Sequence, residues 1–246
     1  MKVRPYIIFV TLLFYPVFLS VSLIVSLVLI ALGIIRRPFL TKRQAQRMIR
    51  LYMLIYGKIV IRLGFPWIRI RYEDMDSEHP HPCIYICNHR SASDPFVMAV
   101  LSGEFVQVVN TWPFKLPVYG FFARFAGYLN IRQISIESFL AQGKKLLSQS
   151  VAIVGFPEGT RSTTLKMGPF HSAMFRLALA SKVPIVPICL QGTEHTPAKG
   201  SLWICPTEVK VRKLPAISYD LYKDMSPFKL KNYVRDIIDK QLQEMN

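Results

Sequence analysis

The stretch CIYICNHRSASDP, residues 83–95, passes from an apolar run to a short polar segment. A short apolar run bounded by polar residues is typical of a buried β-strand. The next residues, 95–101, are again mostly apolar and begin with a proline, which favours a helix. We therefore predict a strand over 83–87, a turn over 88–94 and a helix over 95–101.

The chain after residue 66 repeats this alternation of strands and helices. Residues 67–71 alternate apolar and basic side chains, as a half-exposed strand does. Other predicted strands are 105–109, 128–131, 151–156, 185–190 and 208–213, and other predicted helices are 136–147, 172–180 and 226–243. This alternation predicts an α/β fold whose mixed, largely buried sheet is flanked by helices.

The chain begins with a segment that we expect to be embedded in a membrane. Tyr6–Ile35 contains no charged residue, and about 20 apolar residues are enough for a helix to span a bilayer. The segment continues into Arg36-Arg37-Pro38 rather than a small-residue cleavage site, which favours an anchor over a signal peptide. More positive charge follows the segment than precedes it, so we expect the body on the cytoplasmic side. Spanning the bilayer and re-entering one leaflet both stay open.

An expected helix over 41–63 carries its basic residues on one side. They are Arg43, Arg47, Arg50, Lys58 and Arg62. The pattern fits a helix in the membrane interface, and it also fits a surface helix with a solvated basic stripe; the adjacent apolar segment favours the interface. Gly64 and Pro66 mark the expected boundary between membrane-anchoring helices, residues 1–64, and an α/β domain, residues 65–246.

The chain has 31 Lys and Arg residues against 15 Asp and Glu residues. This excess favours an anionic partner, which could be phospholipid head groups, nucleic acid or a phosphorylated substrate. Nucleic acid is disfavoured, because the sequence has no helix-turn-helix spacing, zinc finger or aromatic RNA-binding motif. Cys83, Cys87 and His89 form a C-x3-C-x-H pattern without a second pair of ligands, so we expect no metal site.

The predicted turn over 88–94 contains two candidate catalytic residues, His89 and Asp94. A tight turn could bring the two side chains together. A carboxylate on one imidazole nitrogen fixes the tautomer and lets the other nitrogen take a proton from a hydroxyl. Asp94 also precedes Pro95, as a helix N-cap does. Taken alone, the stretch leaves the catalytic and the structural interpretation equally open.

A second group of candidates lies in Phe156–Ser162, which has the sequence FPEGTRS and follows a predicted strand. Gly159 permits a sharp turn with exposed amides, and Arg161 can bind a phosphate through paired hydrogen bonds. The alternative is a surface turn in which Glu158 and Arg161 form an ion pair of little energetic value. Charged groups beside a buried strand favour the interpretation that these residues bind a ligand.

Two weaker signals accompany these groups. Lys115–Arg132 contains Pro117 and Gly120, which predict a turn, and three phenylalanines that suit either an acyl chain or the core. Val183–Thr193 contains two prolines that bracket a short strand. Neither stretch alone distinguishes a functional role from a structural one.

Together these blocks resemble the glycerophospholipid acyltransferase family (PlsC-like), which includes bacterial 1-acyl-glycerol-3-phosphate acyltransferase. The family's N-H-x4-D pattern is met at Asn88–Asp94, its F-P-E-G-T-R-S block at Phe156–Ser162 and its proline-flanked strand at Val183–Ile188. Lys115–Arg132 resembles the remaining block. The resemblance covers about residues 66–195 in the family's order, and the ordered set is far more specific than H-x4-D alone.

The resemblance implies a role for each matching residue. His89 is the general base on an acceptor hydroxyl, and Asp94 orients it. The residues expected to bind the substrate are Glu158, Gly159, Thr160, Arg161, Arg132 and Lys115. Arg161 is expected on a phosphate. The acyl group is expected to come directly from an acyl-CoA or acyl carrier protein thioester, with no cofactor and no metal.

The resemblance therefore predicts a membrane-bound O-acyltransferase for a lysophospholipid, most of all 1-acyl-glycerol-3-phosphate, with residues 65–246 as the catalytic domain. The expected partners are membrane phospholipids, the lysophospholipid and the thioester donor, with no nucleic acid, at the cytoplasmic face of the bacterial inner membrane. Residues 111–113 and 167–171 depart from the family pattern, so another hydroxylated lipid stays open as the acceptor. A non-catalytic lipid-binding protein with the same fold is a third possibility.

Overall fold

The computed structural model describes residues 4–76, 78–115, 117–162 and 166–245. Its strands are β1 (Ile68–Asp74), β2 (Ile84–Cys87), β3 (Phe105–Val109), β4 (Leu129–Asn130), β5 (Ala152–Gly155), β6 (Ile185–Gln191) and β7 (Thr207–Lys213). Over the described residues they form one seven-stranded sheet in the order β1-β7-β6-β2-β5-β3-β4. β6 and β7 run antiparallel, and the other neighbouring pairs run parallel. The predicted mixed α/β sheet is confirmed.

The central strands are apolar along their whole length because both faces of the sheet are covered. Every residue of β2, β3 and β5 is buried. β1 lies at one edge of the sheet, and most of its side chains are half-buried or exposed in alternation. The alternation seen in the sequence of residues 67–71 therefore reflects an edge strand, whereas the continuous apolar runs reflect strands covered on both faces.

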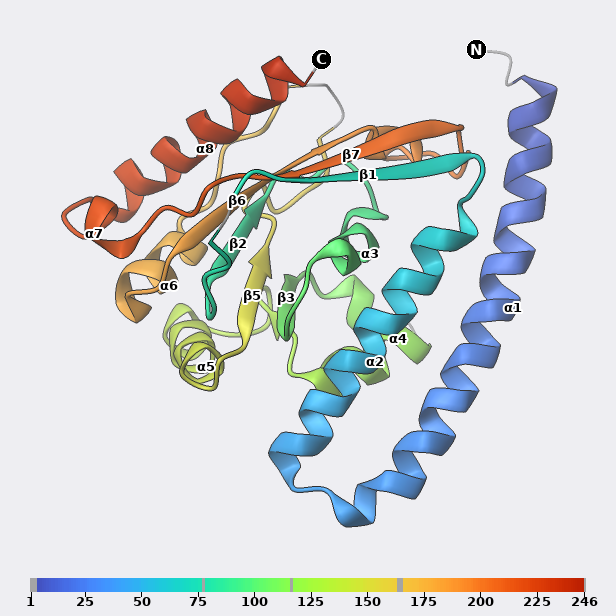
Figure 1. Ribbon diagram of the computed structural model, residues 1–246, viewed down its shortest axis with the longest axis horizontal. Coiled ribbons are helices and arrows are strands. Elements are labelled where there is room, and N and C mark those ends of the chain that lie inside the picture. The colour runs from blue at the N-terminus through green and yellow to red at the C-terminus, as the bar shows by residue number, and fades with distance from the viewer. Residues whose placement is uncertain (1–3, 77, 116, 163–165, 246) are drawn as a thin grey trace.

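Helices cover both faces of the sheet (Figure 1). The helices are α1 (Pro5–Arg36), α2 (Lys42–Leu63), α3 (Asp94–Val97), α4 (Pro117–Ala126), α5 (Ile136–Ser148), α6 (Ala173–Ser181), α7 (Tyr219–Tyr222) and α8 (Pro227–Glu244), with short 3-10 helices η1 (Arg37–Phe39), η2 (Met98–Val100), η3 (Trp112–Lys115) and η4 (Thr193–His195). α5, α6 and α8 bury Phe139, Phe175 and Ile238 on one face. α2 and α3 pack Leu54 and Val97 on the other face.

The turn predicted around Pro117 and Gly120 is wrong, because both residues belong to the helix α4. Proline is well suited to the first position of a helix. A Cβ atom at Gly120 would overlap the backbone of Phe114 in η3. Glycine is therefore needed where η3 packs directly against α4, and not for a turn. Phe122 is buried beside Tyr52 of α2.

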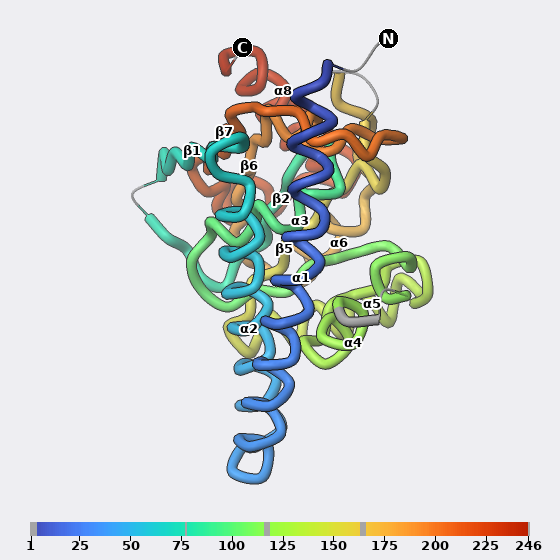
Figure 2. Tube along the Cα trace, turned by 90° about the vertical axis from the view of Figure 1, so that its right-hand side faces the viewer, coloured from blue at the N-terminus to red at the C-terminus, as the bar shows by residue number. Residues whose placement is uncertain are grey.

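α1 and α2 form an antiparallel hairpin whose connected end projects beyond the body (Figure 2). Thr41 and Gln44 form a capping box at the start of α2. Among the described helices, α1 is the one long and apolar enough to cross a membrane, and most of its large apolar side chains are exposed. The length and surface of α1 therefore suit it to membrane association.

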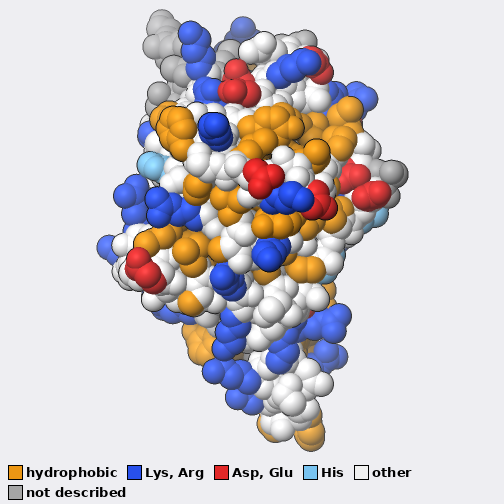
Figure 3. Space-filling view, turned by 90° about the vertical axis from the view of Figure 1, so that its left-hand side faces the viewer, with side chains coloured by type: hydrophobic (Ala, Val, Ile, Leu, Met, Phe, Trp, Pro, Cys, Tyr) orange, Lys and Arg blue, Asp and Glu red, His pale blue; other side chains and the backbone are white. Residues whose placement is uncertain are grey.

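Part of the basic stripe predicted on α2 faces the body and not a membrane surface. Nη1 of Arg43 and Nη1 of Arg50 each lie 2.6 Å from Oε1 of Glu104. Nε of Arg47 lies 3.7 Å from the other oxygen of this carboxylate. Burial opposes ionisation of Glu104, but hydrogen bonds from Arg43 and Arg50 outweigh it and lower its pKa. Figure 3 shows further Lys and Arg side chains over the projecting hairpin.

Replacement of Glu104 by glutamine is expected to lower the free energy of unfolding near neutral pH by about 3 kcal/mol, because buried Arg50 loses its counter-charge. The pKa of Glu104 is lowered in the folded protein, so its stabilisation is present above the ordinary value of 4.5 and is lost as the pH falls through the folded value. Urea unfolding of both proteins near neutral pH and well below this value measures the effect. An equal difference at both pH values would contradict the ion pair.

Candidate active site

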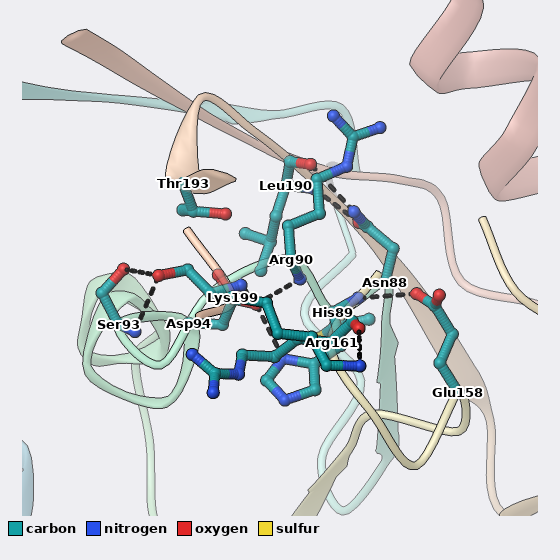
Figure 4. Close-up of polar contacts among 12 residues, drawn as sticks. Asn88, His89, Arg90, Ser93, Asp94, Glu158, Arg161, Leu190, Thr193 and Lys199 are labelled. Atoms are coloured by element: carbon teal, nitrogen blue, oxygen red, sulfur yellow. Dashed lines mark hydrogen bonds and ion pairs between the residues drawn. The ribbon is translucent and has the colours of Figure 1, made fainter. Parts of the chain in front are cut away.

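The four candidates His89, Asp94, Glu158 and Arg161 lie together at the carboxyl ends of the parallel strands (Figure 4). The turn with His89 follows β2, and the turn with Glu158 and Arg161 follows β5, which is the neighbour of β2 in the sheet. Because β7 is antiparallel to β6, the loop over 192–206 that joins them lies at the same edge. Three segments that are far apart in the sequence meet there, at a usual position for a site in an α/β sheet.

His89 and Asp94 are in contact, as the sequence predicts. Nδ1 of His89 lies 2.7 Å from Oδ2 of Asp94, whose side chain is fully buried. The same oxygen accepts hydrogen bonds from the backbone N–H groups of Arg90 (2.7 Å) and Ser91 (2.8 Å). The interpretation of Asp94 as an N-cap is wrong, because Ser93 holds that position and Asp94 is the first residue of α3. Asp94 instead closes the turn and holds the imidazole.

The contact determines which nitrogen of His89 is free. An ionised carboxylate can only accept a hydrogen bond, so Nδ1 carries the shared proton and Nε2 has a free lone pair. The His89 ring packs on Phe156 with ring centroids 4.8 Å apart, and its side chain is 18% exposed. The pair can therefore act as a general base on a hydroxyl that reaches Nε2, with Asp94 stabilising the imidazolium.

The carboxylate of Glu158 joins two backbone segments, one at His89 and one at Gly168. Oε1 accepts a hydrogen bond from the backbone N–H of His89 (2.7 Å), and Oε2 accepts one from that of Gly168 (2.8 Å). Burial raises the pKa of Glu158, although both hydrogen bonds act in the opposite direction. Gly159 has a φ of +67°, and a Cβ there would lie 3.0 Å from the ring of His171. These contacts make Glu158 a positioning residue, and its binding of substrate stays a prediction.

Thr160 and Arg161 lie beside Lys199 of the β6–β7 loop. Figure 4 shows Arg161 and Lys199 next to each other. Nζ of Lys199 donates hydrogen bonds to Oγ1 of Thr160 (3.1 Å) and to the backbone oxygen of Arg161 (3.2 Å). The backbone N–H of Ser162 donates to the backbone oxygen of His89 (2.9 Å). This bond keeps the segment next to the catalytic turn, which is the turn over residues 88–94 that contains the candidate base. The arrangement brings two cationic side chains to the neighbourhood of the imidazole.

Lys115 and Arg132 lie farther along the same edge of the sheet. Lys115 ends η3 after β3, Arg132 follows β4, and both are exposed. β3 and β4 are two and three strands away from β2, which corresponds to about 10 and 14 Å at the usual strand spacing. The structure therefore does not bring these two residues into contact with His89, and their role in binding substrate stays a prediction.

Two residues of the catalytic turn hold it to β6 and the loop that follows. The buried side chain of Asn88 donates to the backbone oxygen of Leu190 (2.9 Å) and accepts from its N–H (2.7 Å). Nη1 of Arg90 lies 3.3 Å from Oε1 of Glu194. In the sequence, Arg90 carries no recognisable chemical signal, and Asn88 stands out only as part of the N-H-x4-D pattern. Their partners lie about 100 positions away, and no sequence pattern pointed to them.

Two cavities share lining residues with the segment around His89 and Asp94. A cavity of about 530 Å³ lies between α2 and the body, and apolar side chains form most of its wall. Pro95 and Phe96, which follow Asp94 directly, line part of it. A smaller cavity of about 260 Å³ is lined by residues that include Arg90 and Arg235. Within the described ranges, no group of three or more His, Cys, Asp or Glu side chains is placed to hold a metal ion.

Comparison with known sequences identifies related proteins. A family model described as Acyltransferase matches residues 69–191. The 1-acyl-sn-glycerol-3-phosphate acyltransferase of Limnanthes alba is 32% identical over 191 residues, which cover 75% of this chain and 67% of that protein. The enzyme of the same name from Limnanthes douglasii is 33% identical over 200 residues, covering 78% and 68%. The human 1-acyl-sn-glycerol-3-phosphate acyltransferase alpha is 32% identical over 158 residues, covering 60% and 55%.

Comparison with solved structures identifies the same architecture. The crystal structure of the 1-acyl-sn-glycerophosphate acyltransferase PlsC from Thermotoga maritima matches with a TM-score of 0.80, covering 97% of this chain and 95% of that chain. The two sequences are 19% identical in this comparison, so the likeness concerns the fold. It extends over the sheet, the flanking helices and the N-terminal hairpin.

Proposed function

The chain belongs to the acyltransferase family, and we propose that it transfers a fatty acyl group to the hydroxyl of a lysophospholipid, 1-acyl-glycerol-3-phosphate. The observation that carries the proposal is the His89–Asp94 pair beside the cationic side chains of Arg161 and Lys199. An acceptor with both a hydroxyl and a phosphate fits these two parts of the site. The names of the curated relatives support the same acceptor.

In the proposed reaction the acceptor hydroxyl donates a hydrogen bond to Nε2 of His89. Nε2 takes the proton as the hydroxyl oxygen attacks the carbonyl carbon of an acyl-CoA or acyl carrier protein thioester, and Asp94 stabilises the imidazolium. The tetrahedral intermediate then collapses with cleavage of the carbon–sulfur bond. The imidazolium returns the proton to the leaving thiolate, so the products are the acylated lipid and a free thiol.

The buried cysteines support direct transfer over a covalent acyl-enzyme. A cysteine attacks as the thiolate, and burial in apolar surroundings disfavours that form. Burial raises the pKa of Cys83 and of Cys189 to about 12, and it raises the pKa of Cys87 well above its ordinary value. The acceptor hydroxyl activated by His89 is the simpler nucleophile.

The proposal assigns the two ends of the acceptor to different parts of the site. Arg161 binds the phosphate, and Lys115 and Arg132 add positive charge along the same edge of the sheet. The cavity of about 530 Å³ is proposed to hold an acyl chain, because its wall is mainly apolar. Its lining includes Pro95 and Phe96, the two residues that follow Asp94 in the sequence.

The proposal includes attachment to a membrane through α1. The exposed apolar surface of α1 supports it, and the basic residues after α1 support a body on the cytoplasmic side. The bacterial inner membrane stays a prediction, because the curated relatives include chloroplast and animal proteins.

The double substitution Leu23→Asp with Leu27→Asp is expected to move most of the protein from the membrane pellet to the soluble fraction after a carbonate wash. Both side chains are more than half exposed on α1, and a carboxylate inside the bilayer costs about 3 kcal/mol. Leu221→Asp, at an equally exposed position on α7, is the matched control. Membrane recovery that equals that of the unaltered protein would contradict the assigned anchor.

Glu158→Gln is expected to lower kcat about 30-fold and to leave the KM for the acceptor nearly unchanged. The glutamine amide group cannot accept hydrogen bonds from both backbone N–H groups, so His89 loses its fixed position. Glu208→Gln, at an exposed position of β7, is the matched control. A raised KM with an unchanged kcat would show instead that Glu158 binds the acceptor.

A donor and acceptor panel tests the proposed function. Purified protein is supplied with acyl-CoA or acyl carrier protein thioesters and with several lysolipids, and the products are identified by mass spectrometry. The proposal predicts phosphatidate from 1-acyl-glycerol-3-phosphate with at least one donor. Acylation of other hydroxylated lipids without acylation of this acceptor would overturn it, and would favour the alternative that residues 111–113 and 167–171 suggest.

A further inference from the structure

Lys199 lies next to the catalytic turn, and its charge is not neutralised by an acidic side chain. Its Nζ donates to Oγ1 of Thr160 and to the backbone oxygen of Arg161, and both acceptors are uncharged. In the part of the chain that the structure describes, neither Lys199 nor Arg161 has a carboxylate within 4.0 Å. Two uncompensated cations beside a general base attract an anionic group.

The geometry leaves Lys199 able to bind a ligand. A lysine ammonium has three N–H donors, and two of those of Lys199 are used by Thr160 and Arg161. The third is available to a phosphate oxygen. Lys199 is exposed, and Figure 4 shows it over the same part of the site as the His89 ring and the Arg161 side chain.

The loop that carries Lys199 is held by the catalytic turn on one side. The hydroxyl of Ser91 shares its single proton between the backbone oxygens of Thr196 (3.1 Å) and Pro197 (3.0 Å). The hydroxyls of Ser93 and Thr196 lie 3.0 Å apart. These bonds tie the segment just before Lys199 to the turn that contains the base.

The same loop is held by α1 on the other side. Oγ1 of Thr11, which is buried, accepts a hydrogen bond from the backbone N–H of Ile204 (3.0 Å). The hydroxyl of Tyr15 donates to the backbone oxygen of Leu202 (2.9 Å). Lys199 therefore lies between two attachment points, one on the catalytic turn and one on the N-terminal helix.

We propose that Lys199 binds the phosphate of the lysophospholipid acceptor together with Arg161, and that α1 holds Lys199 in place through Thr11 and Tyr15. The inference rests on the proposed function, and it adds a phosphate-binding residue that lies outside the matched family region, residues 69–191. It also links the helix that suits a membrane to the part of the site that binds the lipid head group.

Kinetics with two acceptors test the role of Lys199. Lys199→Ala is expected to raise the KM for 1-acyl-glycerol-3-phosphate about 10- to 100-fold, the effect of losing a charged hydrogen bond. It should leave kcat within about twofold, and it should leave the KM for the matching monoacylglycerol, which lacks the phosphate, unchanged. Lys199→Arg should restore most of the affinity. Lys240→Ala, at an exposed position of α8, is the control and should change neither KM.

Other kinetic results with these variants would overturn either the role of Lys199 or the proposed function. An unchanged KM for the phosphorylated acceptor in Lys199→Ala overturns the inference. An equal loss with both acceptors also overturns it, because a purely structural contact to Thr160 and Arg161 would affect both alike. Where monoacylglycerol turns over too slowly, competitive inhibition by glycerol 3-phosphate replaces it, and an unchanged inhibition constant overturns the inference. A wild-type protein that does not acylate the phosphorylated acceptor refutes the proposed function itself.

The role of α1 has its own variants. Thr11→Val with Tyr15→Phe removes the two hydrogen bonds to the loop and keeps the shape of the side chains. The pair is expected to raise the KM for the phosphorylated acceptor several-fold and to leave the KM for monoacylglycerol unchanged. An unchanged KM for the phosphorylated acceptor shows that α1 does not position Lys199.

Discussion

Replacement of His89 by alanine is expected to lower kcat for acylation of 1-acyl-glycerol-3-phosphate about 1,000-fold. A positioned general base contributes about 10²- to 10⁴-fold, and the structure offers Nε2 of His89 for that role. The phosphate contacts proposed for Arg161 do not involve the imidazole, so the KM for the acceptor should change little. Steady-state rates with saturating thioester measure both constants.

A second substitution separates the chemistry from the packing of the ring. His89→Gln keeps a polar side chain of similar length against Phe156 but cannot act as a base near neutral pH. It should be as impaired as the alanine variant, with a thermal midpoint close to that of the unaltered protein. A kcat within tenfold of the unaltered protein in either variant would exclude His89 as the base.

The second large effect is expected from Asp94→Asn, with a loss in kcat of about 1,000-fold. The amide oxygen can still accept from the backbone N–H groups of Arg90 and Ser91, so the turn is kept. In this orientation the amide oxygen also keeps its contact with Nδ1 of His89. The amide is uncharged, however, and cannot stabilise the imidazolium that forms when Nε2 takes the proton of the acceptor hydroxyl.

Measurements of folding and acceptor binding distinguish this loss of kcat from a loss of folded protein. Asp94→Asn is expected to retain the circular dichroism spectrum and acceptor binding of the unaltered protein while losing turnover. Asp236→Asn, on the exposed side of α8, is the matched control. Loss of activity in proportion to loss of folded protein would mean that Asp94 acts only through the structure of the turn.

The sequence predicts most of the sheet because its central strands are short and apolar on both faces. The run that became β2 and the polar turn after it also predict where His89 and Asp94 lie. The contact between His89 and Asp94 could be predicted because the two residues are five positions apart, and the geometry of a tight turn is enough to bring them together. The N-cap interpretation failed at Asp94 because the helix starts one position earlier than expected.

Contacts between distant segments were beyond the reach of the sequence. Arg43 and Arg50 have the spacing of a solvated stripe, and Glu104, more than 50 positions away, turns them inward. Glu158 resembles a ligand-binding residue because it is charged. In the structure its carboxylate accepts hydrogen bonds from two backbone N–H groups, and every residue except proline has such a group, so the sequence does not reveal these partners. Lys199 lies in a loop without a motif, and only the fold places it beside Arg161.

A competition experiment tests the central claim most directly. Equal amounts of 1-acyl-glycerol-3-phosphate and the matching monoacylglycerol are offered to the unaltered protein with one thioester donor, and both products are measured in the same sample. The contacts that we propose from Arg161 and Lys199 to the phosphate predict phosphatidate in about 100-fold excess over diacylglycerol. Diacylglycerol in equal or greater amount would contradict a site that combines the His89–Asp94 base with a phosphate-binding pair.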